Sequence, residues 1–198
     1  MSHQVVDLEC PGCAAAISTE MKTCPKCYRP IVLSSFSSTN VFNPLELNKQ
    51  ANAYRKAMMS HPDNDELNIS AGFCYLKLKL YDKSTECFEK ALVNNFSNAD
   101  AYLYAAVALL KGKKAFVADR KIIDKIVEYV EAAIMIEPKG IYYFFEAYIK
   151  YDYHFRKYYN TSPDFKELYM QAYGNGVTED EINDLFEVMG VSKPDVFM

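Results

Sequence analysis

The sequence predicts a mainly α-helical fold, an array of helical hairpins (an α-solenoid) that follows a small cysteine-rich module. Two observations indicate helices: the chain has only seven glycines, and its apolar residues recur at helical spacing instead of alternating along β-branched runs. A third sets the N-terminus apart, because four of the six cysteines fall within residues 10–27. We expect residues 1–33 to form this module, which we call the ribbon. Residues 34–42 are expected to form a Ser-rich linker, 43–160 the hairpin array and 161–198 capping helices.

The four cysteines of the ribbon are spaced as a metal site. Cys10 and Cys13 form one C-x2-C pair, and Cys24 and Cys27 form a second pair after ten residues. Each pair can fold into a tight knuckle, and two knuckles complete a tetrahedral four-sulfur shell for one zinc ion. Such a shell has no open position, so the zinc is expected to be structural. Two disulfides, or a single redox-active pair, are the alternatives.

The ribbon needs this metal, because about 30 residues bury too little apolar surface to fold alone. We expect Ile17, Met21 and Ile31 to cover the site. The segment 14–23, between the knuckles, is short enough for a hairpin.

A family resemblance supports this interpretation. Residues 8–32 resemble a short bacterial and archaeal zinc-ribbon family that reads C-P-x-C-G, an isoleucine and, about ten residues on, C-P-x-C-G. The cysteines fall on its ligand positions and Ile17 on its apolar position, whereas Ala14 and Tyr28 replace its usual glycines. The resemblance implies a recognition or docking module and no single function.

The helical body begins after a Ser-rich run. Residues 33–39 read LSSFSST, a composition typical of linkers. Asn43 and Pro44 then predict a helix start, with Asn43 as the N-cap and Pro44 in the first turn.

The body resembles tetratricopeptide repeats, helix–turn–helix units of about 34 residues. The best unit is residues 65–98, which carries Gly72, Tyr75, Phe88 and Ala91 at repeat positions. Gly72 is expected to let the two helices of this unit approach closely.

Flanking units are more degenerate. Further first helices are expected from near Ala99 and from Ile141, with an insertion of about eight residues around 111–119. Beyond the repeats, Ser162-Pro163 is expected to cap a helix. A Thr178–Glu181 capping box predicts another helix, which stops at Gly190.

By the same resemblance, first helices line a groove that binds extended peptides. The expected contact residues are Ile69, Phe73, Leu76, Lys77, Leu103, Val107, Lys111, Tyr142, Phe145 and Tyr153. Ile69 and Phe73 occupy positions of the family's Lys/Asn carboxylate clamp, so we expect apolar contacts. Alternatively, the chain's own C-terminal helices fill the groove.

An aromatic run carries ten Tyr or Phe residues between Tyr142 and Tyr159. It is consistent with a packed terminal helix pair or with a nucleobase-stacking platform that uses Lys150, Arg156 and Lys157. We favour packing for this run, and a solvated loop for the basic stretch 111–121.

The overall charge favours a protein partner. The formal net charge is −4, so the strongly basic footprint of a nucleic-acid or membrane-surface protein is missing. No apolar run reaches the ~20 residues of a membrane span, and the N-terminus lacks a signal peptide, which predicts a cytoplasmic protein. No catalytic motif is evident, so no enzymatic activity is expected.

The sequence therefore predicts a non-catalytic adaptor that binds a protein or peptide through the hairpin array and the ribbon. The alternative is a nucleic-acid-associated protein whose ribbon contacts RNA or DNA through Lys22, Lys26 and Arg29. A homo-oligomer through Tyr-rich surface stays open.

Overall fold

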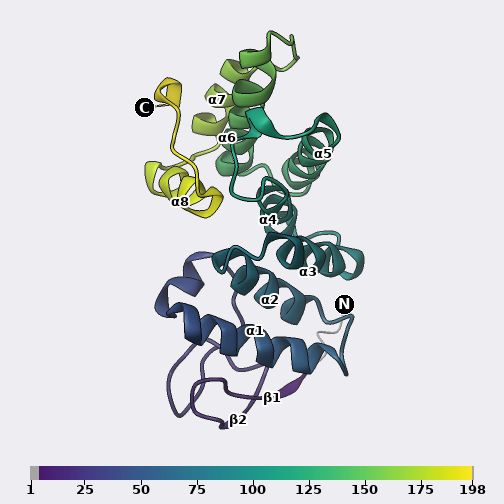
Figure 1. Cartoon of the computed structure of the whole chain (residues 1–198), viewed down its shortest axis with the longest axis vertical. Coiled ribbons are helices and arrows are strands. Elements are labelled where there is room, and N and C mark those ends of the chain that lie inside the picture. Colours follow the sequence, from purple (N-terminus) through teal and green to yellow (C-terminus); the bar gives the residue numbers. More distant parts are fainter. Residues whose placement is uncertain (1–4, 198) are drawn as a thin grey trace. The chain divides into compact units, whose positions relative to one another are not determined.

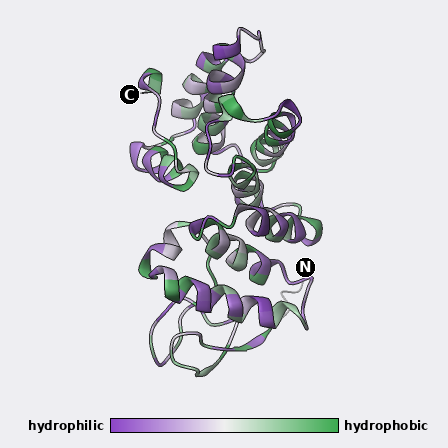
Figure 2. Cartoon of the chain, in the orientation of Figure 1, coloured by the Kyte–Doolittle hydropathy of each residue, from purple (hydrophilic) through white to green (hydrophobic). Residues whose placement is uncertain are grey.

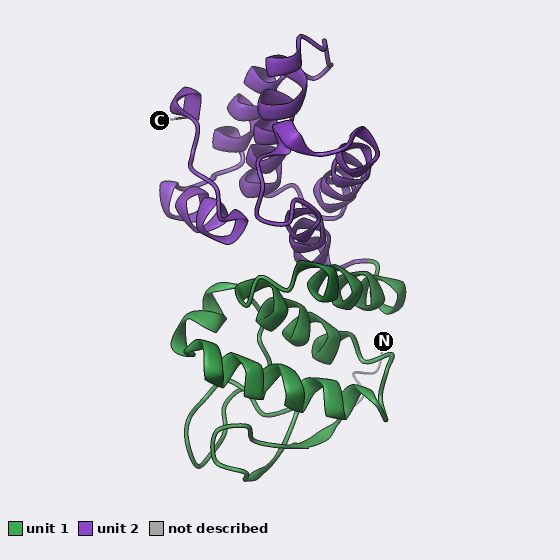
Figure 3. Ribbon diagram, viewed as in Figure 1, with its two compact units in different colours: residues 1–96 green, residues 97–198 purple. Residues whose placement is uncertain are grey.

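The computed structural model describes residues 5–197, which divide after Phe96 into two compact units, unit 1 and unit 2 (Figure 3). The first four residues of the expected ribbon and residue 198 lie outside the described part. The strands are β1 (Asp7–Glu9) and β2 (Ala16–Ser18). The α-helices (Figure 1) are α1 (Pro44–Met58), α2 (Asp65–Lys77), α3 (Tyr81–Asn94), α4 (Ala99–Leu109), α5 (Arg120–Ile136), α6 (Gly140–Ile149), α7 (Phe165–Gly174) and α8 (Glu179–Met189).

Unit 1 contains the ribbon and three helices. Strands β1 and β2 pair antiparallel with Leu8 opposite Ile17, and β1 lies against α1. Helix α1 packs on α2, and α2 packs on α3. The pair α2–α3 covers the repeat unit expected at 65–98.

Unit 2 continues with helical hairpins. Helix α4 packs on α5, α5 on α6 and α6 on α7, while α8 contacts α4 and α6. The expected insertion is the connection between α4 and α5, which carries the short 3-10 turn η2 (Ala115–Val117). Helix α6 runs into a π-helical turn, η3 (Lys150–His154), and a 3-10 turn, η4 (Phe155–Lys157).

Local sequence sets several helix ends. Asn43 is the N-cap of α1, as expected, and it also forms a capping box with Glu46; Thr178 and Glu181 form the capping box that was expected for α8. Gly190 ends α8 in the left-handed conformation at φ 67°.

One expected cap is displaced. Asp164, not Ser162-Pro163, is the N-cap of α7, because its carboxylate accepts from the N–H groups of Lys166 and Glu167. Glu167 completes a capping box there by accepting from the Asp164 N–H. The Asp164 carboxylate can accept hydrogen bonds from the first amides of the helix, whereas a proline side chain has no acceptor.

The close approach of α2 and α3 depends on Gly72. A Cβ at this position would lie 2.9 Å from the ring of Phe88, which is fully buried. Ser84 of α3 donates from its hydroxyl to the Gly72 carbonyl at 2.9 Å. The expected role of Gly72 follows from these contacts.

The Ser-rich segment is packed in this structure. Leu33 and Phe36 are buried, and the Leu33 N–H donates to Ser70 Oγ of α2 at 3.0 Å. Residues Ser37–Val41 form the 3-10 turn η1. The boundaries between the four expected segments stay a prediction.

The predicted fold class, a mainly α array of helical hairpins that follows a small N-terminal ribbon, is confirmed. The helices carry both hydrophobic and hydrophilic residues (Figure 2): the buried residues of α5 recur at helical spacing, whereas α2 and α6 are buried on most sides because each packs between two neighbours. Among residues 5–197, no helix combines the length and apolar character needed to cross a bilayer.

Candidate metal centre and adjoining groove

The four ribbon cysteines converge on one point. Their Sγ atoms all lie within 4.8 Å of one another, and together they could hold a metal ion. Cys10 Sγ lies 3.5 Å from Cys27 Sγ, and Cys13 Sγ lies 3.6 Å from Cys24 Sγ. In a tetrahedral zinc–thiolate shell, bonds of about 2.3 Å separate the sulfurs by about 3.8 Å. The sulfur positions are therefore compatible with a four-thiolate shell.

Both knuckles have the same backbone hydrogen bonds. The N–H of Ala14 donates to the Cys10 carbonyl, and the N–H of Tyr28 donates to the Cys24 carbonyl, each at 2.8 Å. The N–H of each first cysteine also donates to the residue five positions later, again at 2.8 Å. Each C-x2-C pair thus closes a tight turn that points two sulfurs to one side.

Ala14 and Tyr28 adopt left-handed backbone conformations, at φ 57° and φ 58°. The zinc-ribbon family that residues 8–32 resemble usually has glycine at these two positions, and glycine adopts this conformation without steric cost. The knuckles therefore keep their geometry despite both replacements.

The thiols have different electrostatic environments. Burial raises the pKa of Cys10 to about 12. The backbone N–H of Cys27, and then that of Lys26, lower the pKa of Cys24 to about 6 by donating to its sulfur. A cation among the sulfurs would favour the thiolate at all four positions.

A small apolar cluster surrounds the sulfurs. Ile17 and Ile31 are buried against Cys10 and Cys24, as expected. Met21 was expected to join them, but it is 40% exposed. The reason is the chain path: the expected hairpin between the knuckles does not form, and each knuckle is the turn of its own antiparallel pairing.

The ribbon is anchored to helices of unit 1. Tyr54 of α1 is fully buried and donates from its hydroxyl to the Ile31 carbonyl at 2.6 Å. Gln50, one turn earlier, donates to Tyr54 Oη at 2.7 Å. Tyr54 was not predicted as an anchor from the sequence, where its only signal was the i, i+4 spacing from Gln50.

Arg29 is also engaged in this anchoring. It pairs with Glu46 of α1, and its guanidinium lies 5.9 Å from the centre of the Phe42 ring. Two of the three cations of the nucleic-acid alternative, Lys22 and Lys26, are exposed. Arg29 instead joins the ribbon to the helical body.

A groove of about 940 Å³ lies between the β1–β2 hairpin and α1. The hairpin wall includes Leu8, Ile17 and Met21, with the acidic Asp7 and Glu9. The helix wall is one face of α1 and the turn that follows, formed by Asn52, Ala53, Lys56, Ala57, Ser60 and His61. Cys10 and Ala14 line the same groove, so the metal site supports one of its walls.

The expected peptide-contact residues of the hairpin array lie mostly inside the protein. Ile69 and Lys77 are half-buried and Lys111 is exposed. The other seven are buried: Phe73, Leu76, Leu103, Val107, Tyr142, Phe145 and Tyr153. Their role in peptide binding stays a prediction.

The chain matches no protein-family model and no curated protein. Among solved structures, it is similar to "MamA MSR-1 C2" at 14% identity, with a TM-score of 0.46 over 77% of this chain and 87% of the other. A MamA structure labelled AMB-1 aligns at 13% identity, with a TM-score of 0.48 over 75% and 87%. "Crystal structure of MamA" aligns at 18% identity, with a TM-score of 0.33 over 77% and 98%.

Proposed function

We propose that this protein is a non-catalytic adaptor that binds a segment of a partner protein, and that its ribbon holds one structural zinc ion. The observation that supports the adaptor role most is the groove between the metal-site hairpin and α1. One wall is a face of α1, and the other is the β1–β2 hairpin, whose turn carries Cys10 and Cys13 of the candidate metal site.

Zinc fits the donor set. Cys10, Cys13, Cys24 and Cys27 would supply four thiolates, which suit zinc and fill its tetrahedral shell. Bound there, the ion supplies cross-linking between the two knuckles. The residues around it bind and position the ribbon, since Tyr54 and Arg29 attach it to the helices.

The groove suits a short peptide. Its helical wall is about two turns of α1, roughly 10 Å, which matches three extended residues. Leu8 and Met21 on the hairpin wall offer an apolar contact for one anchor side chain. Asp7 and Glu9 on the hairpin, opposite Lys56 on α1, give the two walls different charge. A partner segment with one apolar side chain beside a basic residue would match the apolar contact and the acidic hairpin wall. That the first helices of the hairpin array bind a peptide is a second, separate proposal.

The test is affinity capture from native cell extract with nuclease added, using zinc-loaded full-length protein. Ala53→Arg fills the groove from the half-buried helix wall. Ala132→Arg places the same change at a half-buried position on α5. The proposal expects one protein partner that Ala53→Arg and zinc chelation both release and Ala132→Arg retains. Equal capture by all forms would contradict it.

A further inference from the structure

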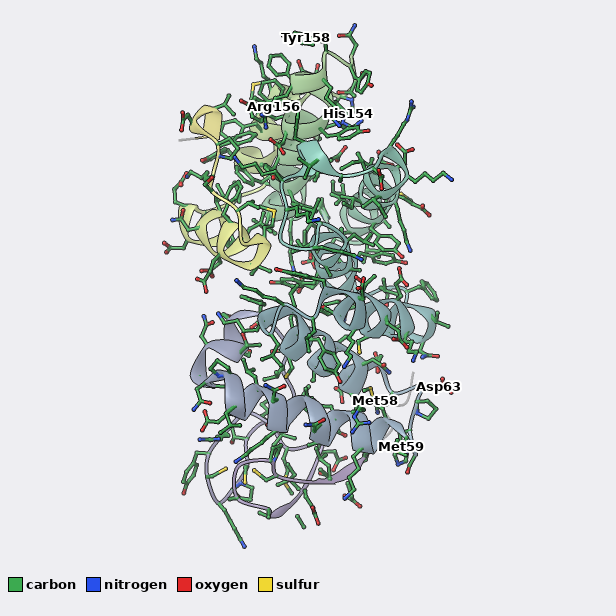
Figure 4. The ribbon with its side chains drawn as sticks, viewed as in Figure 1. Met58, Met59, Asp63, His154, Arg156 and Tyr158 are labelled. Atoms are coloured by element: carbon green, nitrogen blue, oxygen red, sulfur yellow. The ribbon has the colours of Figure 1, made fainter. Side chains whose placement is uncertain are left out.

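The aromatic run at the end of α6 divides into two parts. Its first part is buried; Tyr142, Phe144, Phe145 and Tyr148 are at most 1% exposed. Its last part is on the surface: Phe155 is 55%, Tyr158 95% and Tyr159 54% exposed. Tyr158 and Arg156 lie at one end of unit 2 (Figure 4). The packing expected for this run therefore accounts for its first part only.

The basic stretch 111–121 is fixed to this same end. The Phe116 N–H donates to Asp152 Oδ2 at 2.8 Å, and the carboxylate of Asp152 is almost fully buried. The guanidinium of Arg156 lies over the Phe116 ring at 4.4 Å, and Lys157 Nζ lies 5.1 Å from its centre. Two segments separated by about 40 residues thus form one surface.

This surface is strongly basic in an acidic protein. Segments 111–121 and 152–160 contain seven lysines and arginines and two acidic residues, Asp119 and Asp152, of which Asp152 pairs with Arg156, while the whole chain has a net charge of −4. Lys113 and Lys114 are exposed. Such a local concentration attracts an anionic partner.

Tyr158 is held in an unfavourable conformation without contributing to the core. Its backbone is left-handed, at φ 61°, which is costly for a bulky side chain. With 95% of the residue exposed, the ring gains almost nothing from burial. The left-handed turn closes the end of η4, where the N–H of Tyr158 donates to the Phe155 carbonyl and the N–H of Tyr159 donates to the His154 carbonyl, and it presents the Tyr158 ring to solvent.

We propose that the aromatic–basic patch, formed by Lys113, Lys114, Phe155, Arg156, Lys157 and Tyr158, binds single-stranded nucleic acid. Exposed rings offer faces on which unpaired bases stack, and the surrounding cations contact phosphates. An acidic peptide would use the cations and leave the rings idle. A duplex would keep its bases stacked internally, away from Tyr158. This surface lies in unit 2, so the proposal is independent of the ribbon groove.

The experiment measures fluorescence anisotropy of a labelled 12-nucleotide single-stranded RNA with zinc-loaded full-length protein. Tyr158→Ala is expected to raise Kd about tenfold, whereas Tyr158→Phe keeps the ring and the affinity. Lys113→Gln with Lys114→Gln removes two phosphate contacts. It is expected to lower the slope of log K against log salt concentration by about 1.4. Thermal melts check that the exposed substitutions leave the fold intact.

The charge-matched control is Lys22→Gln with Lys26→Gln in the ribbon, which should bind as the wild type does. A 12-base-pair RNA duplex and a 12-residue polyglutamate peptide should compete at least tenfold less well than unlabelled single strand. Three results would each overturn the proposal: no binding of single strand, an unchanged Kd for Tyr158→Ala, or loss of binding in the ribbon variant. Equal competition by polyglutamate would also contradict the proposal, because it would indicate that the patch binds an acidic protein segment and not nucleic acid.

Discussion

Ala14 and Tyr28 show that the knuckle turn is set by the position of the cysteines more than by the residue that follows them. Both residues sit at left-handed φ, where a side chain costs roughly 1–2 kcal/mol. Two short hydrogen bonds in each knuckle hold this backbone in place. The ribbon therefore carries local strain that a glycine would remove.

We predict that Ala14→Gly stabilises the zinc-loaded ribbon by about 0.5–1 kcal/mol, because relief of strain outweighs the greater freedom of the unfolded chain. Chemical denaturation measures the change. Ala16→Gly is the matched control in strand β2 and should destabilise by a similar amount. Destabilisation by both variants would refute the strain argument.

Gly72→Ala is predicted to destabilise unit 1 by about 1–3 kcal/mol, because the added methyl meets the buried, rigid ring of Phe88 at 2.9 Å. Urea unfolding measures the loss. Gly174→Ala at the end of α7 has nothing within 4 Å of its new Cβ, so it should be neutral or slightly stabilising. An unchanged midpoint for Gly72→Ala would mean that α2 and α3 can separate without cost.

At the scale of elements, the ribbon depends on α1. Tyr54→Phe removes the hydroxyl that donates to the Ile31 carbonyl and accepts from Gln50. Because both partners are buried, we predict a loss of about 1–3 kcal/mol in the free energy of unfolding. Tyr28→Phe, at 78% exposure, is the control and should change nothing. Equal stability of the two variants would show that the ribbon attaches by other contacts.

The π-helical turn η3 carries a pH dependence. Burial, followed by the nearby Lys150, lowers the pKa of His154, while Asp124 of α5 acts in the opposite direction. The unfolded imidazole, with a pKa near 6.5, takes up a proton that the folded one resists. Stability is therefore full above about pH 6.5 and is lost as the pH falls below it.

We predict that His154→Gln flattens the fall in unfolding free energy between pH 7 and 5, by up to about 1.4 kcal/mol per pH unit. Denaturation series at several pH values give the difference in unfolding free energy between the wild type and His154→Gln. The ribbon thiols contribute equally to both proteins, so their titration does not affect this difference. Parallel curves would show that His154 titrates alike in the folded and unfolded chains.

At the scale of the whole molecule, the two compact units predict a divided response to metal removal. Chelation should expose the amides of β1 and β2 to hydrogen exchange, because the ribbon cluster is small, while α4–α8 keep their protection. A variant with Cys74→Ala and Cys87→Ala should still bind one metal ion by mass spectrometry. Loss of protection in α6 on chelation would contradict the division.

The sequence alone determined what depends on neighbours along the chain. The C-x2-C spacing indicated both knuckles, Asn43 and Thr178 marked helix starts, and Gly72 marked a close helix pair, because each acts within one turn or one hairpin. Repeat spacing gave the hairpin array for the same reason.

Only the tertiary structure decided which surfaces are open. Met21 and Ile17 look alike in sequence, yet the path of the β1–β2 hairpin buries one and exposes the other. The aromatic run reads as continuous, yet it ends at the surface beside a loop about 40 residues away in sequence. The ribbon groove likewise depends on how the β1–β2 hairpin packs against α1, and no sequence motif links these two segments. Burial is set by contacts distant in sequence, which local spacing does not encode.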